Sequence, residues 1–510
     1  MGAEPSDGFR RVLLSSETDI KFAVERGRKP TVVEGMSEGT RQPFAYETIY
    51  FDTNDFDLRR HRIELCVRNR DGQVFQRIKT RQDNGNILGC QSHEIVLSDP
   101  EPNLGHARAL LAPNLRDAIS RSALKPRFRT RFSRISHQFA NDSCITRASF
   151  DQGCIEATGR RAAASIPTRK NASPFLAEVP AALLVEEAAR GYRLATGELP
   201  HAVGAPHLAV PWNLPLPQAI LRILRHGFQH FLDNYPAVTL AGEPEGIHQM
   251  RVAMRRLLSA IRMFGPVLRL EDTRGLFQAL KTLFTQLGEV READVFIGET
   301  LPSLAAAGLG TTLESVLRRE IAAFRTAAYQ RALDELTSAN FARLVVQLND
   351  WIESRNWLKA DRPIDSLLVE RAAEDFAVPR IRALHAKLLK QGAKARCGTL
   401  EDWHRTRIAA KKLRYAGEPL FQALAPKIDT DRLSKQLSRL QTSLGRLNDL
   451  QTITPFLARV WPYVQDRSRR NFEAVEHFCR GWSGAAAASL VDRAEEAMRG
   501  FEKIQLDASA

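Results

Sequence analysis

The periodicity of the sequence changes near residue 205, and this change constrains the fold more than any other feature. Before it, short alternating runs are separated by turn residues, among them Asp-Gly at 71–72 and Asn-Gly at 84–85, which favour β-hairpins. After residue 217, apolar residues recur every three to four positions over long segments such as 218–235, as in amphipathic helices. The sequence therefore predicts a β domain followed by an all-α domain.

The two predicted domains are joined by a proline-rich segment. Residues 199–217 contain five prolines, which is typical of a semi-rigid linker. We therefore expect a β domain at 12–200, a linker at 201–217 and a helical domain at 218–505. Helix breaks are expected at Gly265-Pro266 and at Gly392. Strands are expected near 16–25, 46–52, 62–69, 73–80, 92–98, 127–138 and 145–156.

The helical half contains an internal repeat. HQMRVAMRRL at 248–257 matches HRTRIAAKKL at 404–413 with four identities, and TQLGEVREAD at 285–294 resembles TSLGRLND at 442–449. The offsets are 156 and 157 residues. Two independent matches at nearly the same offset predict a duplicated helical bundle.

Both copies of the repeat carry a basic stripe. A histidine is followed by cations at the third and seventh positions, which lie on one face of a helix. Like charges at this spacing repel each other. One such stripe is typical of a solvated face, but two at repeat-related sites indicate helices that bind a chain of phosphates. The candidate residues are His248, Arg251, Arg255, Arg256, Arg262, Arg291, His404, Arg407, Lys411, Lys412 and Arg414.

The two histidines have alternative interpretations. Isolated histidines are usually packed or capping residues, whereas His248 and His404 lead basic stripes and are interpreted here as donors to phosphate. Thr399 and Asp402 resemble a capping box, which would place His404 in the first turn of a helix, where the backbone favours anions.

The net charge agrees with an anionic partner. The formal charge is +14 and the pI is about 9.7, which is expected for a protein that binds nucleic acid, an anionic membrane or a phosphate-rich molecule. A basic host proteome or simple solubility would give the same balance. Nucleic acid is disfavoured because the stripes lack interleaved aromatic residues for base stacking.

The repeated H-x-x-R-h-x-x-[RK]-[RK]-L pattern, with the later LG…D segments, resembles the CHAD domain, the conserved histidine α-helical domain, over about residues 217–505. The resemblance implies two pseudo-symmetric helical bundles that bind inorganic polyphosphate and do not catalyse a reaction. Such a domain could recruit the protein to polyphosphate granules or hold long chains near the β domain, and the sequence leaves both open.

Charged residues also recur on single faces of the predicted strands. Glu17, Asp19 and Lys21 alternate with apolar residues, and Arg127, Arg129 and Arg131 alternate with Phe128 and Thr130. Each pattern alone would also fit an exposed edge strand. Together they indicate a barrel with a hydrophilic lining, suited to metal-assisted phosphoryl transfer to water. The candidates on the other strands are Arg68, Arg77, Lys79 and Glu94.

The ordered pattern E-x-[ED]-x-K, YFDT, LCVR, the basic strands, FDQG and AARGYRLA resembles the CYTH family of triphosphate tunnel metalloenzymes over about residues 15–200. The resemblance implies an eight-stranded antiparallel tunnel that hydrolyses inorganic triphosphate with Mg²⁺ or Mn²⁺. By motif, Glu17 and Asp19 would hold the metal and act in catalysis with Lys21. Substrate would be bound by Arg68, Arg77, Lys79, Glu94, Arg129 and Arg131.

The sequence also departs from the family pattern. Asp19 and Cys66 replace an expected glutamate and arginine, and Arg147 and Glu187 reverse the expected charges. After FDQG, where alternating glutamates are expected, only Glu178 could serve as a metal ligand. Two hypotheses therefore remain: an active triphosphatase, or a degenerate tunnel in a protein that binds or is targeted to polyphosphate.

Composition bounds the location of the protein. The six cysteines are scattered without CxxC or CxxH pairs, which favours reduced structural thiols. No apolar run is as long as the ~18 residues of a membrane span, and the N-terminus lacks the apolar core of a signal peptide. We expect a cytoplasmic protein with no membrane partner.

Overall fold

The structure is a computed structural model. It describes residues 13–23, 41–80, 89–111, 116, 124–140, 145–157, 159–170, 183–184, 187–205, 207–268, 273–355, 357–358, 372–424 and 428–506. Only the backbone is described at 13–23, 41–43, 89–90, 135–140, 145–150, 161–170, 183–184, 187 and 423.

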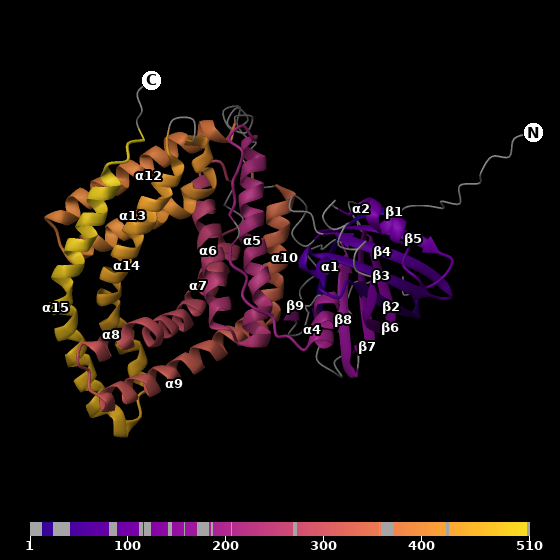
Figure 1. Cartoon of the computed structure of the whole chain (residues 1–510), viewed down its shortest axis with the longest axis horizontal. Coiled ribbons are helices and arrows are strands. Elements are labelled where there is room, and N and C mark those ends of the chain that lie inside the picture. Colours follow the sequence, from indigo (N-terminus) through magenta and orange to yellow (C-terminus); the bar gives the residue numbers. More distant parts are fainter. Residues whose placement is uncertain are drawn as a thin grey trace, which may run out of the picture. The chain divides into compact units, whose positions relative to one another are not determined.

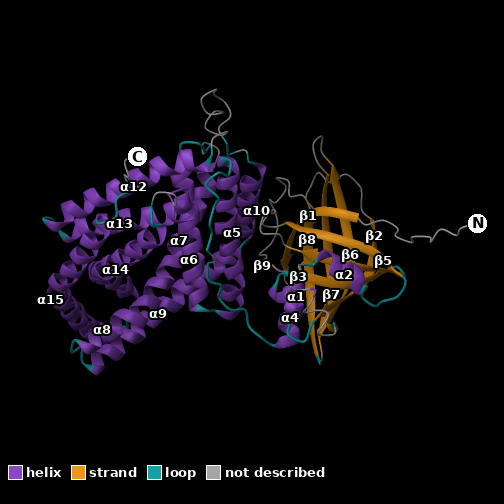
Figure 2. Ribbon diagram, turned by 45° about the horizontal axis from the view of Figure 1, so that its top comes forward, coloured by secondary structure: helices purple, strands orange, loops and turns teal. Residues whose placement is uncertain are grey.

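The chain divides into two compact units, which are described separately. One contains Met1–Pro200 and Glu335–Asp350, and the other contains His201–Asp334 and Trp351–Ala510. The first is built on an antiparallel β-sheet and the second is helical, which confirms the predicted fold class (Figure 2). The exact domain boundaries at 12–200 and 218–505 remain a prediction.

The strands of the first unit close into a barrel. In the described part of the chain, β1 pairs antiparallel with both β5 and β8, so that β1 to β8 form a ring in the order β1-β5-β4-β3-β2-β6-β7-β8, while β9 adds to the end of β1. The strands are β1 Leu13–Ala23, β2 Arg41–Asp52, β3 Ile63–Arg70, β4 Gln73–Thr80, β5 Gly89–Leu97, β6 Lys125–Ala140, β7 Ile145–Ala157, β8 Arg160–Lys170 and β9 Leu183–Leu184.

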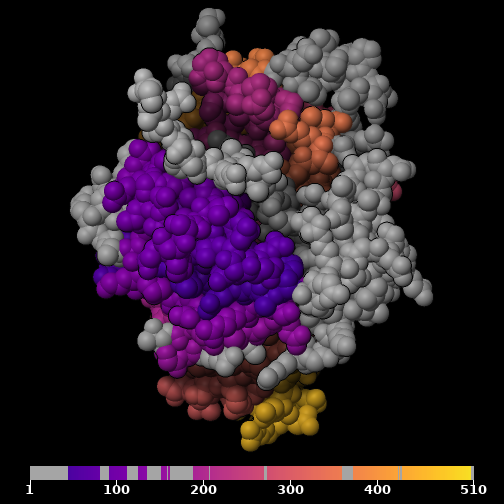
Figure 3. Space-filling model, turned by 90° about the vertical axis from the view of Figure 1, so that its right-hand side faces the viewer, coloured from indigo at the N-terminus to yellow at the C-terminus, as the bar shows by residue number. Residues whose placement is uncertain are grey.

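The two faces of the barrel wall are distinguished by exposure. On β6, the side chains of Thr130 and Phe132 are 0% and 2% exposed, whereas those of Arg129 and Arg131 are 44% and 51% exposed. A closed barrel exposes only its outer face to this extent, so the first pair lies on the inner face. Figure 3 shows one side of the described surface of this unit.

An aromatic cluster fills part of the barrel interior. Its members come from β2, β3, β6, β7 and α4 (Glu187–Thr196). A Cβ at Gly191 of α4 would lie 2.0 Å from the ring of Phe128, so glycine lets the helix approach the aromatic residues closely. The buried members are Tyr46, Tyr50, Cys66, Phe128, Phe132, Ile155, Ala188 and Tyr192.

A second apolar cluster covers the outer face of β2, β3 and β4 beneath α1 (Asp57–Arg60) and α2 (Leu104–Leu110). It contains Phe51, Leu58, Ile63, Leu65, Val67, Ile78, Ala107 and Leu111. Apolar residues therefore alternate between an interior cluster and an exterior one along the same strands.

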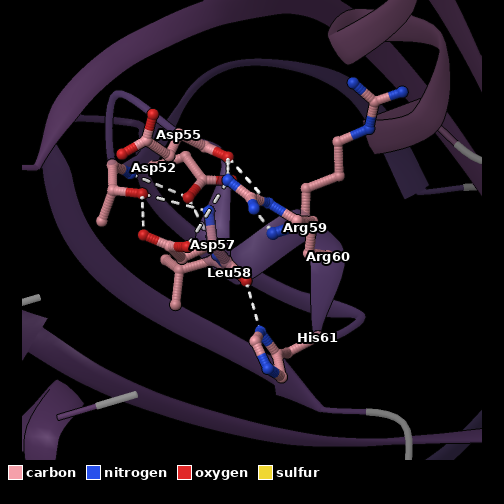
Figure 4. A network of polar contacts seen from close by, with 8 residues as sticks. Asp52, Asp55, Asp57, Leu58, Arg59, Arg60 and His61 are labelled. Carbon is pink, nitrogen blue, oxygen red and sulfur yellow. Dashed lines mark hydrogen bonds and ion pairs between the residues drawn. The ribbon is translucent and has the colours of Figure 1, made fainter. Parts of the chain in front are cut away.

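The aspartate of the YFDT motif holds α1 in place (Figure 4). The carboxylate of Asp52 accepts hydrogen bonds from the backbone N–H groups of Thr53 at 2.8 Å, Leu58 at 2.9 Å and Arg59 at 3.0 Å, and from the Tyr192 hydroxyl of α4 at 2.9 Å. Burial raises the pKa of Asp52, while these donors act to lower it. The motif therefore has a structural role, joining β2 to α1 and α4.

The helices after residue 215 form the rest of the fold (Figure 1). The two copies of the repeat fall on corresponding helix pairs, α6–α7 and α13–α14. The helices are α5 Leu216–Ala241, α6 Pro244–Phe264, α7 Arg274–Val295, α8 Leu301–Ala306, α9 Thr311–Leu336, α10 Ala339–Ser354, α12 Ala373–Arg396, α13 Leu400–Gly417, α14 Thr430–Val460 and α15 Arg469–Glu502.

The structure confirms one predicted helix break and contradicts the other. Helix α6 ends at Phe264, directly before Gly265. Gly392 instead lies inside α12, where a Cβ would be 2.4 Å from the terminal methyl carbon of Met498 on α15. This glycine therefore allows close helix packing and does not end a helix. The strands β8 and β9 were not among the strands predicted.

Candidate functional site

Two arginines share one tyrosine inside the barrel. The guanidinium carbon of Arg68 lies 4.6 Å from the ring centroid of Tyr46, and that of Arg134 lies 5.0 Å from it. Arg68 Nε also donates to Thr48 Oγ1 at 3.0 Å. Arg134 is paired with the buried Asp151 through two hydrogen bonds of 2.6 Å. The charge of Arg134 is therefore neutralised, and no ion pair joins Arg68 to an acid among the described residues.

Three further predicted residues share this inner face. In the strand register, Arg77 lies opposite Cys66 on β3 and opposite Glu94 on β5, while Lys79 lies opposite Ser92. Directly opposite residues in a sheet point to the same face. The side chain of Lys79 is 8% exposed. The barrel thus brings Arg68, Arg77, Lys79 and Glu94 to one face, as predicted.

The first strand continues this face in its backbone register. Position 15 lies opposite Ser92 and position 17 opposite Cys90, while position 19 lies opposite Lys170 of β8. Positions 17, 19 and 21 therefore share the sheet face of Glu94. The side chains of Glu17, Asp19 and Lys21 lie outside the described part of the structure, and so does Glu178.

The predicted role of Arg129 and Arg131 is a correction. Both lie on the outer face, where Arg129 Nη1 is 3.3 Å and Arg131 Nε is 3.1 Å from Glu47 Oε1, and Arg131 also pairs with Glu156 at 3.2 Å. The alternation of β6 separates them from the inner face. The arginine of this strand that faces the interior is Arg134, which lies in phase with Phe128 and Phe132.

Candidate metal ligands are few among the described side chains. No group of three or more His, Cys, Asp or Glu side chains lies close enough there to hold a metal ion. The closing strand β8 has the sequence RRAAASIPTRK, so it supplies no carboxylate. Oxygen donors at positions 17 and 19 would suit a hard divalent cation, and they fit this requirement only in part without a contribution from β8.

In the helical unit, the repeat-related basic stripes converge from α6 and α13. Arg251 Nη1 donates to the carbonyl of Phe284 on α7 at 2.7 Å, and its guanidinium stacks 4.5 Å from the Phe284 ring. Arg255 Nη1 donates to the hydroxyl of Tyr415 on α13 at 3.0 Å. The cations are therefore fixed by hydrogen bonds and aromatic rings instead of by acids.

The pKa values show how closely these cations are gathered. Burial, followed by the charges of Arg407 and Arg255, lowers the pKa of Lys411 to about 7. Burial and Arg255 lower the pKa of Arg251 to about 10. Burial also lowers the pKa of Arg407. Repulsion between cations from different helices favours their neutral forms, and a bound anion would remove that cost. We call Arg251, Arg255, Arg407 and Lys411 the central basic cluster.

Acidic and neutral groups from α7 and α14 border the central basic cluster. Burial raises the pKa of Asp449, which is partly offset by Arg407 and Lys411. Burial and then Arg291 lower the pKa of His248. Arg291 lies 4.0 Å from Glu299. His248 and Arg291 are thus close to the central basic cluster, as predicted.

His404 has a different environment from its repeat partner. Its Nδ1 lies 2.8 Å from Asn448 Oδ1. The predicted capping box is present, with the Thr399 N–H donating to Asp402 at 3.0 Å. Helix α13 begins at Leu400, so His404 is its fifth residue and lies just beyond the first turn, which corrects the predicted placement.

The remaining predicted cations form two side groups. Burial lowers the pKa of Arg256, whose nearest charges include Glu418 and Arg414. Arg414 donates to Gln441 at 2.9 Å. Burial and then Lys387 and Arg262 lower the pKa of Lys412. Arg262 and Lys412 therefore belong with Lys387.

Sequence reasoning missed several residues that shape these sites. Arg134 escaped attention because only the alternating arginines of β6 were considered. Tyr415 directly follows Arg414, and Phe284 directly precedes the repeated TQLG segment, but neither has a counterpart of the same type in the other repeat. Asp449 lies within the repeat and could have been found as the acid next to Asn448.

The chain resembles known families in two separate regions. A family model for the CHAD domain matches residues 222–458, and one for the CYTH domain matches residues 15–157. A crystal structure of the CHAD domain from the plant Ricinus communis is 29% identical, with a TM-score of 0.50, and the match covers 60% of this chain and 98% of that one. No curated protein matches the chain.

Two other solved structures are similar at lower identity. PptA from Streptomyces chartreusis is 16% identical with a TM-score of 0.40, over 57% of this chain and 99% of that chain. A proposed adenylyl cyclase from Hippeastrum with a dominant triphosphatase activity is 15% identical with a TM-score of 0.21, over 31% of this chain and 80% of that chain. No helix among the described residues is long and apolar enough to cross a membrane.

Proposed function

Because the chain joins a CYTH domain to a CHAD domain, we propose that it hydrolyses inorganic triphosphate in its barrel and binds inorganic polyphosphate in its helical unit. The observation that carries the proposal is the convergence of buried cations from repeat-related helices in the central basic cluster. Such a cluster is costly without an anion and suits one that carries several charges.

Polyphosphate binding follows from how the central basic cluster is held. Arg251 and Arg255 are positioned by Phe284 and Tyr415, so they need no carboxylate to orient them and their remaining N–H groups can reach phosphate oxygens. Arginine offers two parallel donors to a phosphate group and lysine offers a point charge. Cations from two helices suit a chain of linked phosphates better than a single anion.

Triphosphate hydrolysis is supported by the charges inside the barrel. Arg68, Arg77 and Lys79 would grip phosphate oxygens and stabilise the negative charge that develops on the transferred group. Tyr46 and Thr48 orient Arg68, whose Nε is already bound. Enclosure in the barrel would limit access of bulk water and strengthen these interactions.

CYTH tunnel enzymes generally use a divalent metal, and Glu17 and Asp19 are the residues of this chain that would hold it. When bound, such an ion neutralises phosphate charge and positions or activates water. Lys21 lies on the same strand face and would contact the phosphate chain beside them. We expect Mg²⁺ or Mn²⁺, because both prefer oxygen ligands.

A second candidate function is favoured by one specific observation. The closing strand β8 contains no acid, so a barrel that needs carboxylates from both β1 and β8 would bind metal weakly. In that case the barrel would hold triphosphate or polyphosphate without cleaving it. The protein would then act as a polyphosphate-binding or targeting protein, for example at polyphosphate granules in the cytoplasm.

Phosphate release from inorganic triphosphate, measured with Mg²⁺ or Mn²⁺, separates the two functions. We expect release by the unmodified protein and none by Glu17→Gln, with polyphosphate binding retained in both. Release that survives in Glu17→Gln would place the reaction elsewhere. No release by either protein, together with polyphosphate binding, would favour the degenerate barrel.

A further inference from the structure

Helix α14 carries a row of exposed cations that the central basic cluster does not use. Arg432, Lys435, Arg439 and Arg446 are all exposed. Their spacing of three, four and seven residues keeps them within roughly 60° of the helix circumference. From first to last they span about 21 Å at 1.5 Å per residue. We call these four residues the α14 stripe.

The stripe lies on the side of α14 opposite its packed face. The buried residues of the same segment are Leu433, Leu437, Leu440, Leu444 and Leu447, which recur with the heptad spacing of a core-facing seam. The α14 stripe therefore has no part in packing the helical unit.

The stripe also lacks acidic partners. Among the described residues, no ion pair or side-chain hydrogen bond joins any of its four members to another group, whereas Arg405 on α13 pairs with Glu401 at 3.4 Å. Like charges three and four residues apart destabilise a helix. The cost is therefore uncompensated in the protein alone.

The stripe is not a remnant of the duplication. At the 157-residue offset of the repeat, the corresponding positions of α7 are Gly275, Gln278, Thr282 and Glu289. The central basic cluster draws on both halves, but this row of charge occurs only in the second half. It is therefore a separate feature of α14.

We propose that the α14 stripe is a second binding track for a long inorganic polyanion, engaged by polyphosphate chains that extend beyond the central basic cluster. This inference rests on the proposed function of the helical unit. It adds that long chains are bound at two places and short chains at one, so that affinity increases with chain length.

The surroundings of the stripe favour an inorganic chain over other polyanions. Residues 430–450 contain no aromatic side chain, so nucleic-acid bases would have no stacking platform. Every exposed residue between 431 and 446 is polar or charged, so the helix offers no apolar side chain to a membrane. A line of point charges matches a line of phosphates.

The test compares long-chain polyphosphate with tripolyphosphate on the full-length protein. The stripe variant replaces Arg432, Lys435, Arg439 and Arg446 with glutamine, a good helix former. The control variant removes the same charge from exposed, scattered positions on or just after α15, by replacing Arg470, Arg480, Arg493 and Lys503 with glutamine. Circular dichroism and thermal melting check that both variants are folded, and Arg439→Gln with Arg446→Gln serves if the fourfold variant is not.

We expect the stripe variant to bind long polyphosphate about tenfold or more weakly, with the salt dependence reduced by about one unit of slope per lost contact. Tripolyphosphate binding should match that of the control variant. Equal loss in both variants would reduce the effect to net charge and overturn the inference. Loss of single-stranded DNA or anionic-vesicle binding without loss of polyphosphate binding would also overturn it. If the unmodified protein binds neither phosphate probe, both the inference and the proposed polyphosphate binding fail.

Discussion

A Cβ at position 288 would lie 2.4 Å from Nη1 of Arg251, so Gly288 on α7 leaves the space that the guanidinium of Arg251 occupies on its way to the Phe284 carbonyl. The repeat-related Gly445 has nothing within 4 Å of the same point. The two halves of the helical unit therefore hold their corresponding arginines differently.

Gly288→Ala should displace Arg251 without unfolding the protein, because the clashing atom is the end of a flexible side chain. We expect weaker polyphosphate binding, by no more than the roughly 1.5–3 kcal/mol of one charged hydrogen bond. Isothermal titration calorimetry measures the change. The matched control is Gly445→Ala, which should leave affinity unchanged and stabilise α14 by up to about 1 kcal/mol. Equal affinities of the two variants would contradict the role of Gly288.

Arg251→Ala and Arg407→Ala should each weaken polyphosphate binding by roughly 1.5–3 kcal/mol. Their effects on stability should differ. Arg251 donates to Phe284 at 2.7 Å, whereas Arg407 Nε is buried without a hydrogen-bond partner among the described residues. We therefore expect a larger fall in Tm for Arg251→Ala. Arg405→Ala, on an exposed turn of α13, is the control, and unchanged affinity in the first two variants would refute the central basic cluster as the binding site.

Polyphosphate binding should weaken as pH rises from 6 to 8. The pKa of Lys411 is lowered to about 7, so the free protein loses this charge over that range, and a bound anion favours the protonated lysine. Binding near pH 7 should therefore take up a proton. Calorimetry in buffers with different ionisation enthalpies measures the uptake. Lys411→Arg, which stays charged, should flatten the pH dependence, and an unchanged profile in that variant would exclude Lys411 as its source.

Tyr192→Phe should destabilise the barrel. The Tyr192 hydroxyl donates to Asp52 at 2.9 Å in a buried site, and a hydrogen bond to a charged group contributes roughly 1.5–3 kcal/mol. Differential scanning calorimetry should show a lower transition temperature for the N-terminal unit. The transition of the helical unit is the internal control. A shift of that second transition instead would contradict the assignment.

Much of the fold was predictable because its signals are local. Turn residues located β3 at Ile63–Arg70 and β4 at Gln73–Thr80 within one residue of the predicted ranges. The helical period placed Arg251 and Arg407 on repeat-related stripes, and the structure brings those stripes together. A repeat that keeps its charge pattern already specifies which helix faces must meet.

Other features depended on contacts that a sequence does not display. The arginines of β6 were assigned to the site by their residue type, but the side of the barrel is decided by which phase carries Phe128 and Phe132. Gly392 resembled a helix break because its packing partner, Met498, lies more than a hundred residues away in the sequence. Strand β8 has few strand-forming residues, and its pairing with β7 and β1 determines its conformation.

The closure of the barrel by β1 has a consequence for synthesis on the ribosome. Leu13–Ala23 leaves the ribosome first, yet its partners are Gly89–Leu97 and Arg160–Lys170. Pairings of such large sequence separation are slow to form. Seven strands can therefore pair with their neighbours as they emerge, while the segment that contains Glu17 and Asp19 waits for the rest of the barrel. The end of the chain that is made earliest completes the active face last, so that any metal-binding capacity arises only once the barrel is whole.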